Sequence, residues 1–292
     1  MTTQLPLEAQ RSTQVDRSSG IHQLPLYLAL IPLLLLAYQN LLVPVGGLPP
    51  LPVADIGVAM FVALFSLFHN LYTFGWRNTL ALFGITLVVA WGFEQTSVAT
   101  GLPYGVYHYS DALGAKLGHV PYAIPFAWYS MLYPSYVMAR LMTSGAQSGS
   151  QPGWRGLLWR AFVSGMVITA WDVLVDPMAS APGVHSWVWE QGHSWVWEQG
   201  GAYYGVPNLN FVGWVLTGFT VILLYSLFEL RFPARPLGSW TRFVLVLPLM
   251  VYGLTMLQLM LRSDAPSEWP VLAAFVMGFP LVAALSQLRK TA

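Results

Sequence analysis

Residues 24–45 read LPLYLALIPLLLLAYQNLLVPV and contain no charged side chain. A helix rises ~1.5 Å per residue, so this stretch can cross the ~30 Å hydrocarbon core of a bilayer. A cleaved signal peptide has a shorter apolar region that ends in small residues, so we predict a retained helix. This stretch indicates an all-α integral membrane protein.

Composition extends the same conclusion to the whole chain of 292 residues. Hydrophobic residues make up 55% of it and charged residues only 9%, whereas soluble domains contain about 25% charged residues. The net charge of +1 argues against a nucleic-acid partner, because phosphate binding requires a basic surface. The absence of cysteine excludes disulfides, thiolate nucleophiles and iron–sulfur clusters.

Apolar segments of spanning length recur along the chain. We predict eight transmembrane helices, at 24–45, 53–73, 78–100, 122–142, 156–176, 208–230, 240–261 and 269–287. Residues 1–23 are polar and mixed in charge, which predicts a disordered N-terminal tail. Residues 24–292 then form one polytopic helical domain.

Lysine and arginine predict the orientation, because cytoplasmic loops carry an excess of both. All but two of the 13 such residues fall in the tail, in the loops after the second, fourth and sixth helices, and at the C-terminus. They are Arg11, Arg17, Arg77, Arg140, Arg155, Arg160, Arg231, Arg235, Arg242, Arg289 and Lys290. The opposite side carries Lys116 and Arg262. We therefore expect both termini in the cytoplasm and the protein in the cell (plasma) membrane.

The two long loops on the non-cytoplasmic side, 101–121 and 177–207, are rich in aromatic residues interleaved with His, Glu and Asn. A passive aromatic belt at the interface is one interpretation. The density of rings favours a partly folded cap over the helix ends. The rings are Tyr104, Tyr107, Tyr109, Trp187, Trp189, Trp195, Trp197, Tyr203 and Tyr204.

The second of these loops contains a repeat. Residues 185–192 read HSWVWEQG, and residues 193–200 repeat them without change. Solenoid units need about 20 residues or more, so a repeat this short is not one. A duplication tolerated in a surface loop is the better interpretation.

Three carboxylates inside predicted spans require an explanation, because ionisable groups are costly in lipid. Glu94 lies about two turns from the outer end of its helix. Asp172 and Asp176, in the run ITAWDVLVDP at 168–177, are four residues apart and therefore share one helix face. The predicted topology places all three at a similar depth near the outer surface. Convergence from distant helices indicates a functional site.

Simpler interpretations exist for one of these carboxylates and for other ionisable residues. Asp176 precedes Pro177 and could merely end its helix. Glu229 lies beside Arg231 and is interpreted as one half of an interfacial ion pair. His69 is interpreted as a hydrogen-bonded histidine between helices. The sequence has no HxxxH or HExxH spacing, so it gives little support to a metal site.

A close carboxylate pair in a medium of low dielectric constant does not readily ionise twice. The pair then offers one acid and one base at neutral pH, as general acid–base catalysis requires. Neighbouring Trp and Tyr faces would stabilise a developing cation.

Several motifs between Trp91 and Trp214 resemble one known family. The run WGFEQTSVATGLPYGVYHYSDALGAKLGHVPYAIPFAW is followed by DVLVDPMAS and then by WVWEQGGAYYGVPNLNFVGW. Together they are similar to the CruF-type membrane carotenoid hydratases, which include γ-carotene 1′,2′-hydratase and bisanhydrobacterioruberin hydratase. The second copy of the octapeptide continues directly into GGAYYGVPNLN, so Trp195 and Trp197 fit the family pattern better than Trp187 and Trp189.

The resemblance implies an enzyme without cofactor or metal that adds water to the terminal ψ-end C1′,2′ double bond of a carotenoid of γ-carotene or lycopene type. It implies catalysis by Asp172, Asp176 and Glu94, with either aspartate as the acid and the other aspartate or Glu94 as the base. The substrate would come from the bilayer, and membrane lipids and other enzymes of carotenoid biosynthesis are the expected partners. Expected substrate-binding residues are Tyr104, Tyr107, His108, Trp128, Trp171, Trp195, Trp197, Tyr203, Tyr204, Asn208, Asn210 and Trp214.

Two rival functions remain open. A prenyltransferase of the UbiA type also uses many helices and a DxxxD motif, with Mg²⁺ and a diphosphate, but this chain has one such motif where that family has two aspartate-rich segments. A proton-coupled transporter would also use intramembrane acids. Such transporters often show inverted repeats, which this sequence lacks. A purely structural scaffold would leave the acids unexplained.

Overall fold

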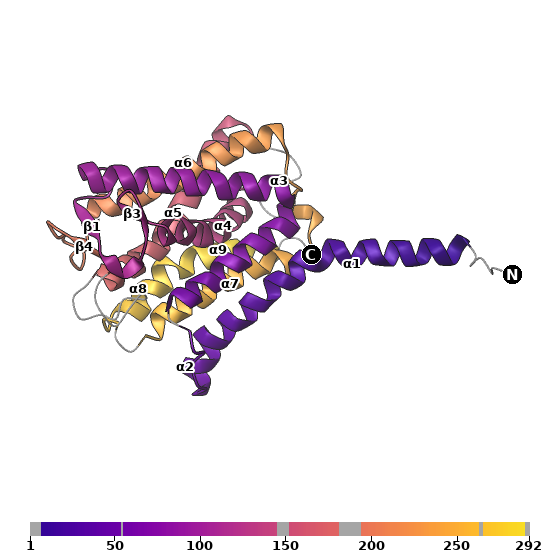
Figure 1. The fold of residues 1–292 in the computed structure, drawn as a ribbon, viewed down its shortest axis with the longest axis horizontal. Coiled ribbons are helices and arrows are strands. Elements are labelled where there is room, and N and C mark those ends of the chain that lie inside the picture. Colours follow the sequence, from indigo (N-terminus) through magenta and orange to yellow (C-terminus); the bar gives the residue numbers. More distant parts are fainter. Residues whose placement is uncertain (1–6, 54, 145–151, 181–193, 263–264, 290–292) are drawn as a thin grey trace.

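We analysed a computed structural model, which describes residues 7–53, 55–144, 152–180, 194–262 and 265–289. Most of these residues are helical (Figure 1). Within the described ranges, six helical stretches are long and apolar enough to cross a membrane. They are His22–Gly46, Val58–Thr100, Trp154–Ser180, Asn208–Arg231, Arg242–Met260 and Trp269–Leu288. The all-α membrane class is therefore confirmed, whereas the eight spans and their orientation stay predictions.

The first helices differ from the predicted boundaries. Helix α1 (Leu7–Ala37) continues through a π-helical turn, η1 (Tyr38–Leu42), into α2 (Val43–Gly46). It begins inside the stretch predicted as a tail, and the disorder of residues 1–23 stays a prediction. Helix α3 (Asp55–Thr100) breaks at Gly75, whose φ of 79° suits a residue without a side chain. Its two halves correspond to the predicted spans 53–73 and 78–100.

The central helix α4 (Ala123–Ser144) packs against α3, α5 (Trp154–Ser180), α7 (Arg242–Met260) and α9 (Gly278–Arg289). It corresponds to the predicted span 122–142 but is absent from the six apolar stretches. Its buried face carries polar groups, including Ser130, Ser135 and Arg140, which lower its hydropathy. The short helix α8 (Trp269–Val276) precedes α9 and completes the bundle.

Helices α5 and α6 (Asn208–Arg231) pack closely side by side, because small residues let their backbones approach. A Cβ atom added at Gly165 of α5 would lie 2.6 Å from the carbonyl oxygen of Val215. One added at Gly218 of α6 would lie 2.9 Å from the Cα of Gly165. This close packing places the first turn of α6 beside the last turns of α5.

The segments between helices fold into short strands at one end of the bundle (Figure 1). Strand β1 (Tyr107–Tyr109) pairs antiparallel with β4 (Trp195–Trp197), with His108 opposite Val196. Strands β2 (Lys116–Leu117) and β3 (Val120–Pro121) form a second pair, and η2 (Asp111–Leu113) is a short 3-10 turn. A further 3-10 turn, η3 (Leu237–Ser239), is not among these strands but in the connection from α6 to α7. The β1–β4 pair contacts α3 and α5. The described loops therefore form the predicted cap, and we call this the strand end of the bundle.

Two buried polar residues outside the strand end also test the predictions. His69 bridges helices, with Nδ1 2.6 Å from the hydroxyl of Tyr133 and Nε2 3.0 Å from the carbonyl of Val244, as predicted. Glu229 is fully buried and pairs with Arg140 at 2.9 Å. The prediction of an interfacial pair with Arg231 is therefore wrong. The carboxylate instead joins α6 to α4, where the guanidinium compensates for the lost hydration.

Candidate active site

The three predicted carboxylates converge at the strand end. Glu94 comes from the second half of α3, and Asp172 and Asp176 come from the last turns of α5. All three are buried and line one cavity. Helix α5 continues through Pro177 to Ser180, so the alternative that Asp176 ends its helix is wrong.

The two aspartates are joined by one side chain of α6. The amide nitrogen of Asn210 donates to Oδ2 of Asp172 at 3.0 Å and to Oδ2 of Asp176 at 2.6 Å. An amide group has two protons, one for each carboxyl group. Asn210 is itself buried in the first turn of α6. The close packing of α5 and α6 therefore fixes both carboxyl groups against one amide.

Asp176 has further donors on its other oxygen. The indole nitrogens of Trp195 and Trp197 donate to Oδ1 at 2.8 and 3.0 Å. The hydroxyl of Ser180 lies 3.4 Å from the same oxygen. Strand β4 presents both rings on one face because alternate residues of a strand point the same way. This set of donors favours a negative charge on Asp176.

Glu94 is surrounded by donors in the same manner. Its Oε2 atom accepts from the hydroxyls of Tyr107 and, at 2.7 Å, Tyr109. Its Oε1 atom accepts from the indole nitrogen of Trp128 at 2.9 Å. Burial, and next the negative charge of Glu94, raise the pKa of Tyr107 and of Tyr109 well above 10. Both hydroxyls therefore remain protonated donors at neutral pH.

Asp172 has fewer partners than either of these carboxylates. Its Oδ1 atom is buried and has no hydrogen-bond partner among the described residues. An unpaired buried oxygen is costly unless it is protonated or bound to water or a ligand. The cavity offers about 40 Å³ to water-sized groups, and ~10–15 Å³ suffices for one water molecule. Asp172 can therefore present an acid to a molecule in the cavity.

Indole rings form the wall beside the acids. The rings of Trp128 and Trp214 stack with centroids 3.8 Å apart and planes 23° apart. Trp171 lies against Trp214, with ring centroids 6.0 Å apart. The faces of such rings attract positive charge, most strongly where water is excluded. The cavity therefore combines proton-transfer groups with a surface that stabilises a cation.

Most of the predicted site residues line this cavity. They are Glu94, Tyr104, Tyr107, Trp128, Trp171, Asp172, Asp176, Trp195, Trp197, Asn210 and Trp214. The hydroxyl of Tyr104 is held 2.7 Å from that of Thr217 on α6. Trp187 and Trp189 of the first octapeptide copy lie outside the described residues.

Four predicted binding residues lie away from the cavity. The side chain of His108 lies on the face of β1 opposite to Tyr107 and Tyr109. It is exposed there, and its Nδ1 atom lies 2.9 Å from the carboxylate of Glu198. Asn208, two residues before the bridging asparagine, is exposed. Tyr203 and the exposed Tyr204 stack edge-on against each other with centroids 5.0 Å apart. None of these four is among the cavity-lining residues.

Tyr109 also lines the cavity, although it is not among the site residues predicted from the sequence. Its hydroxyl contacts Glu94, and its ring lies against that of Trp195 with centroids 6.2 Å apart. The signal was available, because residues 107 and 109 must share a face if YHY is a strand. Among the described residues, no group of three or more His, Cys, Asp or Glu side chains could hold a metal ion.

A comparison with protein families covers the residues that build this site. Residues 55–281 match the family described as "Carotenoid biosynthesis protein". Over 151 residues the chain is 30% identical to the bisanhydrobacterioruberin hydratase of Haloarcula japonica, a match that covers 51% of this chain and 45% of that protein. The match thus spans just under half the length of this curated relative. No solved structure gives a significant match. The family match contains the cavity carboxylates, the aromatic wall and the strand pair, so the chain belongs to the family of carotenoid biosynthesis proteins, and its resemblance to the membrane carotenoid hydratases is confirmed.

Proposed function

We propose that this protein is a carotenoid hydratase that adds water to the terminal ψ-end C1′,2′ double bond of a carotenoid of γ-carotene or lycopene type. One observation carries the proposal. Asp172 and Asp176 share the Asn210 amide in a buried cavity walled by indole rings. The chemistry needs an acid, a base and a surface that tolerates a carbocation, and these groups supply all three.

In the proposed reaction Asp172 is the general acid. Its carboxyl proton passes to C2′ of the alkene, whose π electrons form the new C–H bond. The positive charge then rests on C1′, a tertiary carbon, which the faces of Trp128 and Trp214 would stabilise. Asp172 is chosen because Asp176 and Glu94 each receive several hydrogen bonds that favour their ionised forms.

The second half of the reaction adds water. A water molecule in the cavity attacks C1′ and gives a proton to the carboxylate of Asp176, which leaves a tertiary alcohol. Asp172 is then ionised and Asp176 protonated. Transfer of one proton within the pair restores the starting state, so that alkene and water yield the alcohol without electron transfer. Such proton transfers typically contribute 10²–10⁴-fold to an enzymatic rate.

Glu94 is proposed to hold the water and to keep the cavity negative while the cation forms. Its three donors come from β1 and α4, so it also fixes the cap to the bundle. The scheme requires neither a cofactor nor a metal, since hydration is neither an oxidation nor a reduction and transfers no phosphate group.

The substrate would enter from the bilayer, and its reacting end would lie near the outer surface. This requires both termini in the cytoplasm of a cell-membrane protein. Because the chain has no cysteine, single cysteines at Asp111 and Arg235 can report the orientation. A membrane-impermeant maleimide should label Asp111→Cys in intact cells, and Arg235→Cys only after lysis. The reverse pattern would refute the orientation.

The activity itself is tested by labelling. The purified protein in detergent should convert γ-carotene or lycopene into a product heavier by one water. In H₂¹⁸O the new hydroxyl should carry ¹⁸O, and under ¹⁸O₂ it should not. Label from molecular oxygen would make the protein an oxygenase and refute the proposal.

A further inference from the structure

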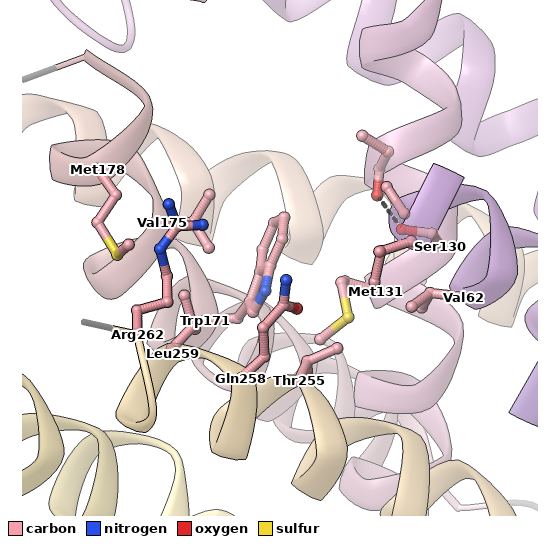
Figure 2. Close-up of a pocket in the computed structure, with 13 residues that line it drawn as sticks. Val62, Ser130, Met131, Trp171, Val175, Met178, Thr255, Gln258, Leu259 and Arg262 are labelled. Atoms are coloured by element: carbon pink, nitrogen blue, oxygen red, sulfur yellow. Dashed lines mark hydrogen bonds between the residues drawn. The ribbon is translucent and has the colours of Figure 1, made fainter. Parts of the chain in front are cut away.

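A second cavity, whose lining residues are shown in Figure 2, shares part of its wall with the carboxylate cavity. It offers about 70 Å³ to water-sized groups. Its walls come from the first half of α3, from α4, from α5 and from the end of α7. Three residues line both cavities, namely Ala127, Trp171 and Val175.

Helix α5 presents a different face to each cavity. Asp172 and Asp176, four residues apart, face the carboxylate cavity. Val175 and Met178 lie on the adjacent face and line the second cavity, with Trp171 and Val175 at the shared edge. The run WDVLVDPM therefore places acids on one stripe and apolar groups on the next.

The lining of the second cavity is mostly apolar, with polar groups contributed by Ser130 of α4 and by Thr255, Gln258 and Arg262 at the end of α7. Val58, Val62 and Met131 supply part of the apolar wall. Figure 2 shows the side chains of Gln258 and Arg262 extending from the end of α7 toward Trp171 and Val175. Such a lining suits a hydrocarbon chain better than a charged or sugar-like ligand.

We infer that this second cavity binds the isoprenoid chain of the substrate, immediately next to the reacting alkene. The inference rests on the proposed function. A carotenoid is about as long as the ~30 Å bilayer core, so the carboxylate cavity can hold only its end. The remainder of the chain must leave through a wall, and the wall that opens into another apolar cavity is formed by Ala127, Trp171 and Val175. Trp171 then sets the angle between the reacting end and the chain.

A substitution that fills the second cavity tests this assignment. Ala59 lines the second cavity from α3, whereas its neighbour Met60 is 52% exposed on the outer surface of the same helix. Ala59→Phe should block the chain, and Met60→Phe is the matched control. The substrates are lycopene and a ten-carbon analogue with the same terminal alkene, which lacks most of the isoprenoid chain. Ala59→Phe should lower kcat/KM for lycopene at least 10-fold and change kcat/KM for the analogue by less than 2-fold. Met60→Phe should change neither value.

Thr255→Leu, on the α7 wall of the same cavity, provides a second variant if Ala59→Phe does not accumulate, and it should show the same selective loss. Unchanged lycopene kinetics in the accumulated variants would overturn the inference alone. Equal losses for lycopene and the analogue would also overturn it, because they would indicate general damage. Failure of the unmodified protein to hydrate either substrate would instead refute the proposed function.

Discussion

The amide nitrogen of Asn210 lies 2.6 Å from Oδ2 of Asp176, across the interface of α5 and α6. The same nitrogen is 3.0 Å from Asp172, so one neutral side chain positions both carboxyl groups. Asn208, two residues earlier, is exposed. On a helix, residues two apart point about 200° apart, which explains why only one of the two asparagines reaches the acids.

This difference gives a matched pair of variants. Asn210→Leu should lower hydration at least 10-fold, because the aspartates lose the donor that sets their spacing and the buried oxygens are left unpaired. Asn208→Leu should stay within 2-fold of the unmodified protein. Product formation per mole of purified protein measures both. Equal activity of the two variants would remove Asn210 from the site.

Asp172→Asn and Asp176→Asn should each reduce hydration by a factor of about 100 or more, as expected for the loss of an acid or a base. Both variants should still insert and accumulate, because asparagine preserves the side-chain volume. Asp111→Asn, which changes an exposed carboxylate, is the control. Near-normal product from either aspartate variant would show that this residue is not a proton-transfer group.

Glu94→Gln should lower turnover by a factor of about 100, because the cavity loses the negative charge near the developing cation and the carboxylate that holds the water. The expected loss has a second cause, because an amide cannot accept from Tyr107, Tyr109 and Trp128 in the same way. Tyr109→Phe removes one of these donors and should give a loss of about 10-fold or less. An unchanged rate with a lower melting temperature for Glu94→Gln would make Glu94 a structural residue.

Hydropathy predicted the membrane class because the bilayer demands long apolar helices whatever they pack against. The predicted spans also placed Glu94 and Asp172 at a similar level, and both residues line one cavity. The ion-pair and hydrogen-bond partners of buried side chains were less predictable. Glu229 has Arg231 nearby in sequence but pairs with Arg140, because the geometry of α4 and α6 decides which guanidinium is within reach. The role of Asn210 likewise depends on the helical phase of α6, which residues 208–214 alone do not fix.

The repeated octapeptide leads to a prediction about the cap. The second copy forms β4, whose Trp195 and Trp197 contact Asp176. The first copy, 185–192, lies outside the described residues. Deleting residues 185–192 should leave at least half of the activity, because the second copy keeps its connection to α6. The control, deletion of both copies (residues 185–200), should abolish it, because no Trp segment then remains to contact Asp176. Complete loss in a well-expressed 185–192 deletion would show that both copies build the site.

The last prediction separates hydration from the prenyltransferase alternative. A DxxxD motif that binds Mg²⁺ needs carboxylate oxygens free to coordinate the ion. In this structure Oδ1 of Asp176 accepts from two indole nitrogens, and Oδ2 of each aspartate accepts from Asn210. Donors in these positions favour proton chemistry over metal binding.

Hydration of lycopene by the purified protein should therefore proceed at an unchanged rate in EDTA, without nucleotide or added metal. The control is the same preparation with Mg²⁺ and a prenyl diphosphate, in which no diphosphate should be released. Loss of activity in EDTA with rescue by Mg²⁺, together with diphosphate release, would establish the prenyltransferase instead. Loss of hydration in EDTA and its rescue by Mg²⁺, without diphosphate release, would show that hydration depends on a metal ion. That outcome would contradict the carboxylate mechanism. An unchanged rate under chelation, lost in Asp172→Asn, would assign the reaction to the carboxyl groups of the cavity and not to a bound metal ion.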